Sequence, residues 1–356
     1  MLFSKFFRFN ALSSLLFATL FSLSFTPSRA SETAASTDST AKEEFNITEM
    51  ILHHIADAHD WHLYDVTHED GSVHAVSIPL PVILYTEGNV DVFLSSAFHH
   101  GESTVKKGDR EYAYDHGHIT ELSGKKVLDF SITKNVASML IGVTLLLILF
   151  ISAARSYANS VPKGLARFLE PLVLFVRDDI AIPNIGEAKY KKYMPYLLTV
   201  FFFIWINNLL GLIPSGANFT GNIAVTLTLA AITMIITNVS GTKTYWGHIF
   251  TPHVPFWLYP IMIPVELIGV ISKPFALTIR LFANITAGHI IILSLVSLIF
   301  IFKSVFISPV SVGFVLFMSF LELLVAALQA YVFTLLSALF IGLALEEPHH
   351  DHEHAH

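Results

Sequence analysis

A single charged side chain, Arg280, lies inside the apolar run Pro274 to Phe302, which contains no other Asp, Glu, Lys or Arg. A charge at that depth in a bilayer costs at least about 2.5 to 3.5 kcal/mol on insertion scales, so it requires a polar partner or a water-filled cavity. Arg280 therefore predicts a site that stabilises charge or conducts an ion.

Further polar side chains accompany it. The next apolar run, Leu321 to Leu345, carries Glu322 and Gln329, and His289 lies nine residues after Arg280. His titrates near neutral pH, and a nearby carboxylate favours its charged form, so a His and a Glu can exchange a proton at modest cost. These residue types predict an ion path, with protons as the expected ion.

An antiparallel hairpin turning at Lys303 to Pro309 would bring the two runs together. A single register then places Arg280 at the depth of Gln329 and His289 at the depth of Glu322. The rise of a helix puts the second pair roughly 10 to 13 Å nearer the outside. Four positions agree with one register, which supports the hairpin.

The first of these runs presents two faces. Asn284 lies about 40° and Ala287 about 20° from Arg280 around an α-helix, so the three share a face, and His289 points roughly the opposite way. Arg280 and the His289/Glu322 pair are therefore expected to serve different surfaces. Glu266, Ser272 and Lys273 lie toward the inner side and are candidates for lining an inner aqueous path.

Simpler explanations remain for each of these residues. In the simpler explanation, Arg280 belongs to a buried structural ion pair or snorkels to the interface. However, it lies too deep to snorkel, and the residue at the same depth in the next run is a neutral amide. His289 and Glu322 form either a structural hydrogen bond or a proton relay, and their matched depth favours the relay. Lys273 either lines a path or snorkels.

The elements that position these residues follow from composition. The chain has 356 residues, of which 53% are hydrophobic and 14% charged, and its mean hydropathy is +0.60, which indicates a polytopic membrane protein. We expect an all-α membrane domain with five transmembrane helices, the last two forming a long tilted hairpin. The expected spans are Val136 to Ala154, Tyr196 to Ile213, Ile223 to Val239, Phe256 to Phe302 and Val310 to Leu345. Lys163 to Ile182 has helical apolar spacing and predicts an interfacial amphipathic helix.

The N-terminal third predicts export. Residues 1–30 read as a signal peptide, with an uncleaved anchor as the alternative. Residues 31–45 are an expected linker, 46–130 a small extracytoplasmic α+β domain, 131–347 the membrane domain and 348–356 a His-rich tail. Basic residues between Arg155 and Tyr193 mark a cytoplasmic loop, so the mature N-terminus is expected outside and the C-terminus inside.

The exported region is acidic and rich in histidine. Residues 31–130 hold 18 acidic and 6 basic residues, which makes nucleic acid an unexpected partner. A helix is expected at Asn46 to Trp61, and strands at Val73 to Tyr85 and Val90 to Leu94, interrupted by Pro79 and Pro81. Its ten histidines are His53, His54, His59, His62, His68, His74, His99, His100, His116 and His118. Metal binding, a proton buffer and a solvated acidic cap all remain open, and no spacing is diagnostic of a metal site. With no cysteine in the chain, no disulfide is possible.

Several segments resemble subunit a of F-type ATP synthases. The matching residues are Ser272-Lys273-Pro274, Leu277 to Asn284, Ala287-Gly288-His289, Leu328 to Thr334, Asn207 to Pro214, Val161-Pro162 and Phe175 to Asp178. The resemblance covers about residues 135 to 347. In the familiar enterobacterial pattern Glu and His occupy the positions of His289 and Glu322 respectively, so this pair is exchanged here, as in mitochondrial relatives.

The resemblance implies a stator subunit of the bacterial inner membrane that faces a rotating c ring and separates two proton half-channels. Arg280 would keep the ring carboxylate ionised and block a leak, with Gln329 and Asn284 nearby, while His289 and Glu322 would line the outer half-channel. Partners would be the c ring, the b subunits of the peripheral stalk, the rest of the ATP synthase and membrane lipid. No cofactor or metal is implied. ATP chemistry would belong to other subunits, because this chain has no phosphate-binding Gly-rich loop of the Walker kind.

Two other classes compete. A zinc or other cation transporter would suit the His-rich regions but needs several membrane ligands, and Arg280 would repel a divalent cation. An intramembrane metalloprotease needs paired His and a Glu on one span, a pattern that the apolar runs lack.

Overall fold

The computed structural model describes residues 57–67, 73–101, 103–115, 117–156, 164–213, 216–217, 219–252, 254–302 and 307–346. The expected signal peptide, linker and His-rich tail lie outside these residues. His53, His54, His68 and His116 also lie outside them.

Among the described residues, five helices are long and apolar enough to cross a membrane. They are α4 (Lys134–Ser156), α7 (Tyr190–Gly211), α8 (Ile223–Ser240), α10 (Tyr259–Phe302) and α11 (Ile307–Leu345). The number and order of the expected spans are thereby confirmed. Pro264 and Pro274 lie inside α10, which nevertheless continues for 44 residues. At about 1.5 Å per residue this length exceeds the hydrocarbon core roughly twofold, so α10 must tilt or extend beyond it.

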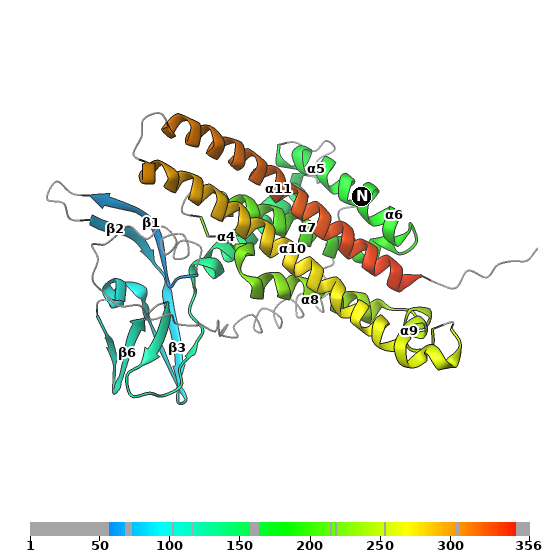
Figure 1. The fold of residues 1–356 in the computed structure, drawn as a ribbon, viewed down its shortest axis with the longest axis horizontal. Coiled ribbons are helices and arrows are strands. Elements are labelled where there is room, and N and C mark those ends of the chain that lie inside the picture. The colour runs from blue at the N-terminus through cyan, green and yellow to red at the C-terminus, as the bar shows by residue number, and fades with distance from the viewer. Residues whose placement is uncertain are drawn as a thin grey trace, which may run out of the picture.

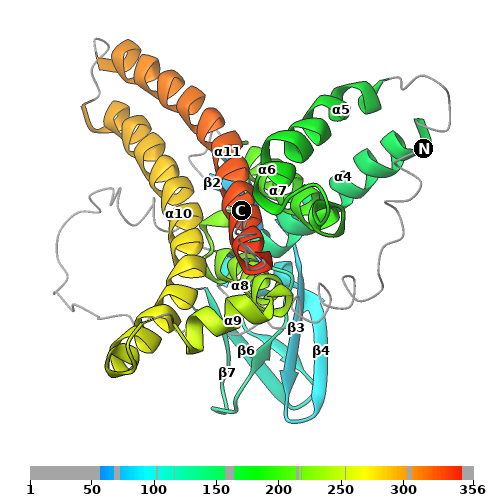
Figure 2. The same ribbon diagram turned by 90° about the vertical axis from the view of Figure 1, so that its right-hand side faces the viewer.

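The two longest helices lie side by side and run antiparallel (Figure 1). On its other side α11 packs against α7, and α8 packs against α10. Fully buried side chains from three of these helices fill the core, among them Leu197, Ile204, Leu277, Leu281 and Ile341. Figure 2 shows α10 and α11 on one side of the bundle, with α4 and α5 (Leu165–Phe175) on the other.

The C-terminal end of α11 is held by hydrogen bonds to its last carbonyl groups, which have no partner within the helix. Lys189 Nζ donates to the Leu345 carbonyl at 3.1 Å. The backbone N–H of Thr242 donates to Ala344 at 2.9 Å, and its hydroxyl donates to the Glu346 carbonyl at 3.0 Å. Because Thr242 precedes α9 (Lys243–Phe250), these bonds join α9 to the end of α11.

The expected amphipathic segment is helical but not a single α-helix. It contains α5, a π-helical stretch at Val176–Ala181 and α6 (Ile182–Ile185). Helix α6 packs against α11, so this segment contributes to the core of the bundle. Its placement at a membrane surface stays a prediction.

The described N-terminal residues form strands. β1 (Asp60–Thr67) and β2 (Val73–Pro79) make an antiparallel ribbon. One three-stranded sheet has the order β4 (Asn89–Leu94), β3 (Pro81–Thr86) and β8 (Leu128–Asp129), and a second has the order β5 (Val105–Lys107), β6 (Arg110–Asp115) and β7 (His118–Glu121). The strand breaks near Pro79 and Pro81 fall where the sequence predicts them.

The α+β expectation for this region is not confirmed. The described part has strands and one short 3-10 helix, Ser95–Gly101. Most of the helix predicted at Asn46 to Trp61 lies outside the described residues, but its last two residues belong to β1, so the prediction is wrong there. Pairing of Asp60 and Trp61 with β2 overrides the helical spacing.

Candidate functional site

His289 and Glu322 are in direct contact across the α10/α11 hairpin. Nδ1 of His289 lies 2.5 Å from Oε1 of Glu322, and the two side chains are only 15% and 7% exposed. The predicted register is confirmed for this pair. A short, largely buried contact between an imidazole and a carboxyl group allows one proton to be shared between them.

A second partner holds the other ring nitrogen of His289. Nε2 lies 3.2 Å from the carbonyl oxygen of Gly211, the last residue of α7, and donates to it. That carbonyl has no helical partner, so the imidazole satisfies a group that would otherwise be unpaired. With hydrogen on Nε2, a neutral ring presents Nδ1 to Glu322 as an acceptor. The sequence does not predict Gly211 as a partner of His289, because a backbone carbonyl leaves no side-chain signal.

Gly288 leaves the space that Glu322 occupies. A Cβ at this position would lie 2.9 Å from Oε1 of Glu322 and 3.2 Å from its carboxyl carbon. Any larger residue would therefore displace the carboxyl group from its place beside His289.

Arg280 lies at the depth of Gln329, as the register predicts, but the contact between them is not the expected one. Nε2 of the buried Gln329 lies 3.4 Å from the backbone carbonyl of Arg280. Arg280 itself is exposed on the outer face of α10, together with Asn284 and Ala287. Within the described part of the chain its guanidinium makes no hydrogen bond or ion pair.

A different face of α10 is buried. Leu277, Leu281 and Ile285 pack into the bundle, and His289 continues toward this inner side. The predicted separation of Arg280 from the His289/Glu322 pair is therefore observed.

The three inner candidates are not joined to one another by hydrogen bonds within the described residues. The hydroxyl of Ser272 donates to the Gly269 carbonyl in its own helix at 3.1 Å. Oε1 of Glu266 lies 4.0 Å from Nδ1 of His248 in α9. Lys273 places its Nζ 5.4 Å from the ring centre of Phe340 in α11.

Asn208 is a further buried polar residue that joins three elements. Its Nδ2 lies 3.4 Å from the carbonyl of Ala326 in α11, and its Oδ1 accepts from the hydroxyl of Thr220 at 2.9 Å. Such bonds favour close helix packing. Asn208 therefore supports α11 about one turn from Glu322.

The described histidines of the β-rich region do not gather with acidic residues into a metal site. No group of three or more His, Asp or Glu side chains in the described ranges is placed to hold a metal ion. His59 instead pairs with Asp129, with Nε2 2.7 Å from Oδ2.

The fold and these contacts define a polytopic membrane protein with a buried contact between a histidine and a glutamate inside a helical hairpin and a positive charge on the outer face of that hairpin. The family model described as ATP synthase A chain matches residues 136–342. The chain therefore belongs to the ATP synthase subunit a family, and the resemblance inferred from its motifs is confirmed.

Curated relatives support this membership. ATP synthase subunit a of Chloroherpeton thalassium is 50% identical over 237 residues, which cover 64% of this chain and 71% of the relative. That of Myxococcus xanthus is 49% identical over 236 residues, covering 64% and 78%. ATP synthase subunit a 2 of Chlorobium luteolum is 44% identical over 308 residues, covering 80% and 89%. A second family model, a domain of unknown function, matches residues 50–138. The cation transporter and the metalloprotease are set aside.

Proposed function

We propose that this chain is the stator subunit that carries protons through two half-channels against the rotating c ring of an F-type ATP synthase. Proton flow then drives ring rotation, and other subunits make ATP. Energy of roughly 2.3 kcal/mol per 100 mV is released for each proton that crosses, and it can bias rotation only if direct leakage is blocked. The proposal rests on family membership together with the position of Arg280.

Arg280 carries the proposal because its charge is exposed on α10 without a partner in the described residues. A positive charge on a helix surface at the depth of the lipid hydrocarbon requires a negative partner, which here must come from another subunit. A carboxylate on the passing ring meets this need, and Asn284 lies on the same face. The charge of Arg280 keeps that carboxylate ionised and repels a proton moving directly between the half-channels.

His289 and Glu322 form the proposed outer half-channel, and Gln329 fixes the backbone of α10 at Arg280. Glu266, Ser272 and Lys273 belong to the proposed inner half-channel. The mature N-terminus is outside a bacterial inner membrane, the C-terminus is cytoplasmic, and b subunits of the peripheral stalk bind the bundle. In this scheme residues 46–130 form an acidic cap outside the membrane.

The test is Arg280→Ala in inverted membrane vesicles that contain the assembled complex. We expect ATP-driven proton pumping to be lost and passive proton leak to increase, because the barrier charge is gone. Ile279→Ala, a truncation at the neighbouring position without loss of charge, is the control and should pump normally. Coupled pumping by the Arg280 variant at wild-type level, with equal assembly, would refute the proposed mechanism.

A further inference from the structure

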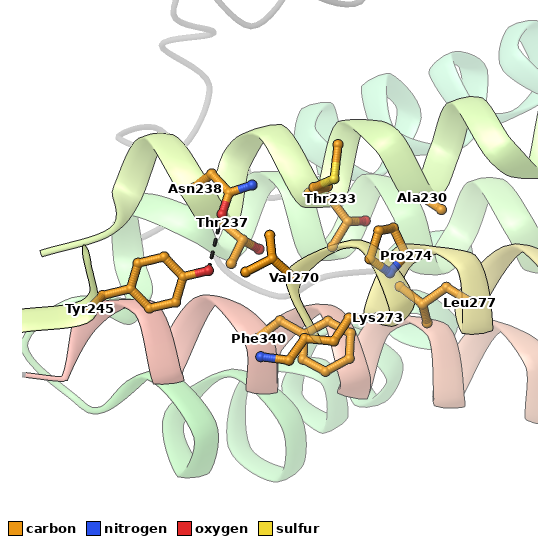
Figure 3. Close-up of a pocket in the computed structure, with 11 residues that line it drawn as sticks. Ala230, Thr233, Thr237, Asn238, Tyr245, Val270, Lys273, Pro274, Leu277 and Phe340 are labelled. Atoms are coloured by element: carbon orange, nitrogen blue, oxygen red, sulfur yellow. Dashed lines mark hydrogen bonds between the residues drawn. The ribbon is translucent and has the colours of Figure 1, made fainter. Parts of the chain in front are cut away.

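The β-rich region takes no part in the proposed proton path, unlike the pocket of the bundle. That pocket lies between α8, α9, α10 and α11 and includes Lys273, a residue of the proposed inner half-channel (Figure 3). The β-rich region instead presents a broad surface of its own, the outer face of the sheet β4–β3–β8, whose exposed side chains are apolar.

The two three-stranded sheets of this region pack against each other. Their shared core contains Val82 and Leu84 of β3 together with Tyr112 of β6, all of them fully buried. Asp91 of β4 also faces the second sheet, because its carboxylate accepts hydrogen bonds from the hydroxyl of Tyr112 at 2.7 Å and from Nη2 of Arg110 at 3.0 Å. Successive side chains of a strand point to opposite faces, so the residues that alternate with these point outward.

The outer face of the sheet β4–β3–β8 is apolar. The outward positions of β3 and β4, which lie opposite one another in the strand pairing, are Pro81, Ile83, Tyr85, Val90, Val92 and Leu94. Val90, Val92 and Leu94 are 61%, 59% and 50% exposed. An antiparallel sheet with one face in water normally places polar residues on that face. In β4 this order is reversed, since valines point outward and Asp91 points inward, so the outer face is expected to meet an apolar environment.

The outer face of the second sheet is different. Lys106 of β5 and His118 and Thr120 of β7 are exposed there, alternating with the buried Val105 and Ile119. These polar side chains suit water. The two sides of the same small region therefore meet different surroundings.

The apolar face is placed beside the membrane helices. Phe130, the residue after β8, is 42% exposed and lies four residues before the start of α4. In Figure 1 β3 lies between β6 and the bundle, so the outer face of its sheet is turned toward the side where the membrane helices lie. Figure 2 looks along the long axis and shows β3 and β4 reaching past the outline of the helices. The face therefore overhangs the space beside the bundle, which in a membrane is filled with lipid.

We infer that the outer face of the sheet β4–β3–β8 rests on the lipid surface beside the bundle, on the side of the membrane where α4 begins. Lipid is favoured over a second protein because the exposed apolar surface continues through Phe130 to the outward side chains of α4. One of these is Ile141, which is 48% exposed and lies in a membrane span.

The residue types suit the boundary between lipid head groups and acyl chains. Burying Val90 and Val92 there removes apolar surface from water. Tyr85 suits the same depth, because its ring is apolar while its hydroxyl can stay hydrated. This contact goes beyond the proposed function, since it gives the β-rich region a role as a support on the membrane.

The test places a fluorescent label on Val92→Cys in the intact complex, held in nanodiscs of phosphatidylcholine and phosphatidylglycerol. Complex with the unsubstituted chain is labelled in parallel as the background, because this chain has no cysteine of its own. A nitroxide near the glycerol end of the lipid acyl chains quenches labels in the interface, and iodide quenches labels in water. We expect the Val92 label to lose most of its emission to the nitroxide lipid and little to iodide. Val90→Cys gives the same measurement if Val92→Cys fails to assemble, since both side chains are exposed.

Thr120→Cys is the matched control, because Thr120 is exposed on the outer face of the second sheet. Its label should be quenched by iodide and not by the nitroxide lipid. Iodide quenching of the Val92 and Val90 labels would place the face in water and overturn the lipid contact. Protection of both labels from both quenchers would also overturn it, because protein would then cover the face. Neither result would touch the proposed function, which Arg280→Ala tests by proton pumping.

Discussion

At the scale of single residues, the two partners of His289 decide which of its nitrogens can exchange a proton. Nε2 is engaged by the Gly211 carbonyl at 3.2 Å, while Nδ1 faces Glu322 at 2.5 Å. A neutral imidazole held this way can gain and lose a proton only at Nδ1 without breaking the bond to α7. The pair is therefore arranged to hold one proton jointly, with Gly211 fixing the orientation of the ring.

Gly288→Ala tests whether that arrangement matters. Its Cβ would lie 2.9 Å from Oε1 of Glu322, so the carboxyl group must move away from His289. We expect proton pumping to fall several-fold while assembly is kept, because a flexible side chain yields more easily than backbone. The measurement is ATP-driven pumping per assembled complex.

Gly269→Ala in the same helix is the control, since nothing lies within 4 Å of its added Cβ. Both substitutions raise helix propensity by about 0.8 to 1 kcal/mol, so only the contact with Glu322 differs. Equal pumping by the two variants would show that the position of the carboxyl group is not critical.

Much of this site follows from the sequence. The depth of each pair is fixed by one register, because helical rise is regular and the polar residues are few. The sequence does not reveal that Gln329 approaches the backbone of Arg280 and not its guanidinium, or that Gly211 holds His289. Both depend on how neighbouring helices pack, and a carbonyl is present at every residue.

At the scale of elements, close approach of α11 to α6 determines where α11 lies. A Cβ on Gly342 would overlap the backbone carbonyl of Asn184 in α6. Backbone at this point is held by the helical bonds of α6 and cannot swing aside as a side chain can. Gly342 therefore permits close contact between α6 and the C-terminal end of α11.

Gly342→Ala is expected to destabilise the bundle by about 1 to 3 kcal/mol or more, the usual cost of overpacking. Less subunit should assemble, and the solubilised complex should melt at lower temperature. Gly313→Ala, in the same helix with open space around its added Cβ, should assemble normally. A melting temperature for Gly342→Ala equal to that of Gly313→Ala would contradict this role.

Element positions are predicted better than element details. The five spans follow from long apolar runs, and α10 stays continuous although Pro264 and Pro274 allow a break. The π-helical stretch at Val176–Ala181 and the short helix α9 have no comparable sequence signal. Both depend on packing against other helices.

At the scale of the whole molecule, the β-rich region is tied directly to the start of α4, as Figure 1 shows. Asp57 accepts from the hydroxyl of Thr133 at 2.9 Å and from the backbone N–H of Asn135 at 3.1 Å. Its carboxylate thus occupies the N-terminus of a membrane helix, where negative charge is stabilised. The contact between His59 and Asp129, both within the β-rich region, lies close by. The β-rich region is therefore joined to the start of α4 by hydrogen bonds as well as by the chain itself.

Asp129 makes the part of the β-rich region that precedes α4 sensitive to acid. Burial alone would raise its pKa, but the hydrogen bond and charge of His59 and the hydrogen bonds from Ser131 hold the pKa below its ordinary value. A carboxyl group with a lowered folded-state pKa contributes full stability above the ordinary value of about 3.9 and loses that contribution as the pH falls through the folded-state pKa. The contribution of Asp129 should therefore be complete above about pH 4 and be lost below it.

Asp129→Asn should reproduce this loss at neutral pH. Removing the charge should cost about 1 to 2 kcal/mol, a modest value because Asp129 is partly exposed. Backbone amides of residues 129–135 in the intact complex should lose protection against hydrogen exchange at pH 7. The further loss of protection below pH 4, measured relative to the intrinsic exchange rate, should largely vanish. Asp109→Asn, in an exposed turn of the same region, should change neither quantity. Unaltered exchange at residues 129–135 in the Asp129 variant would mean that the contact between His59 and Asp129 does not stabilise this segment.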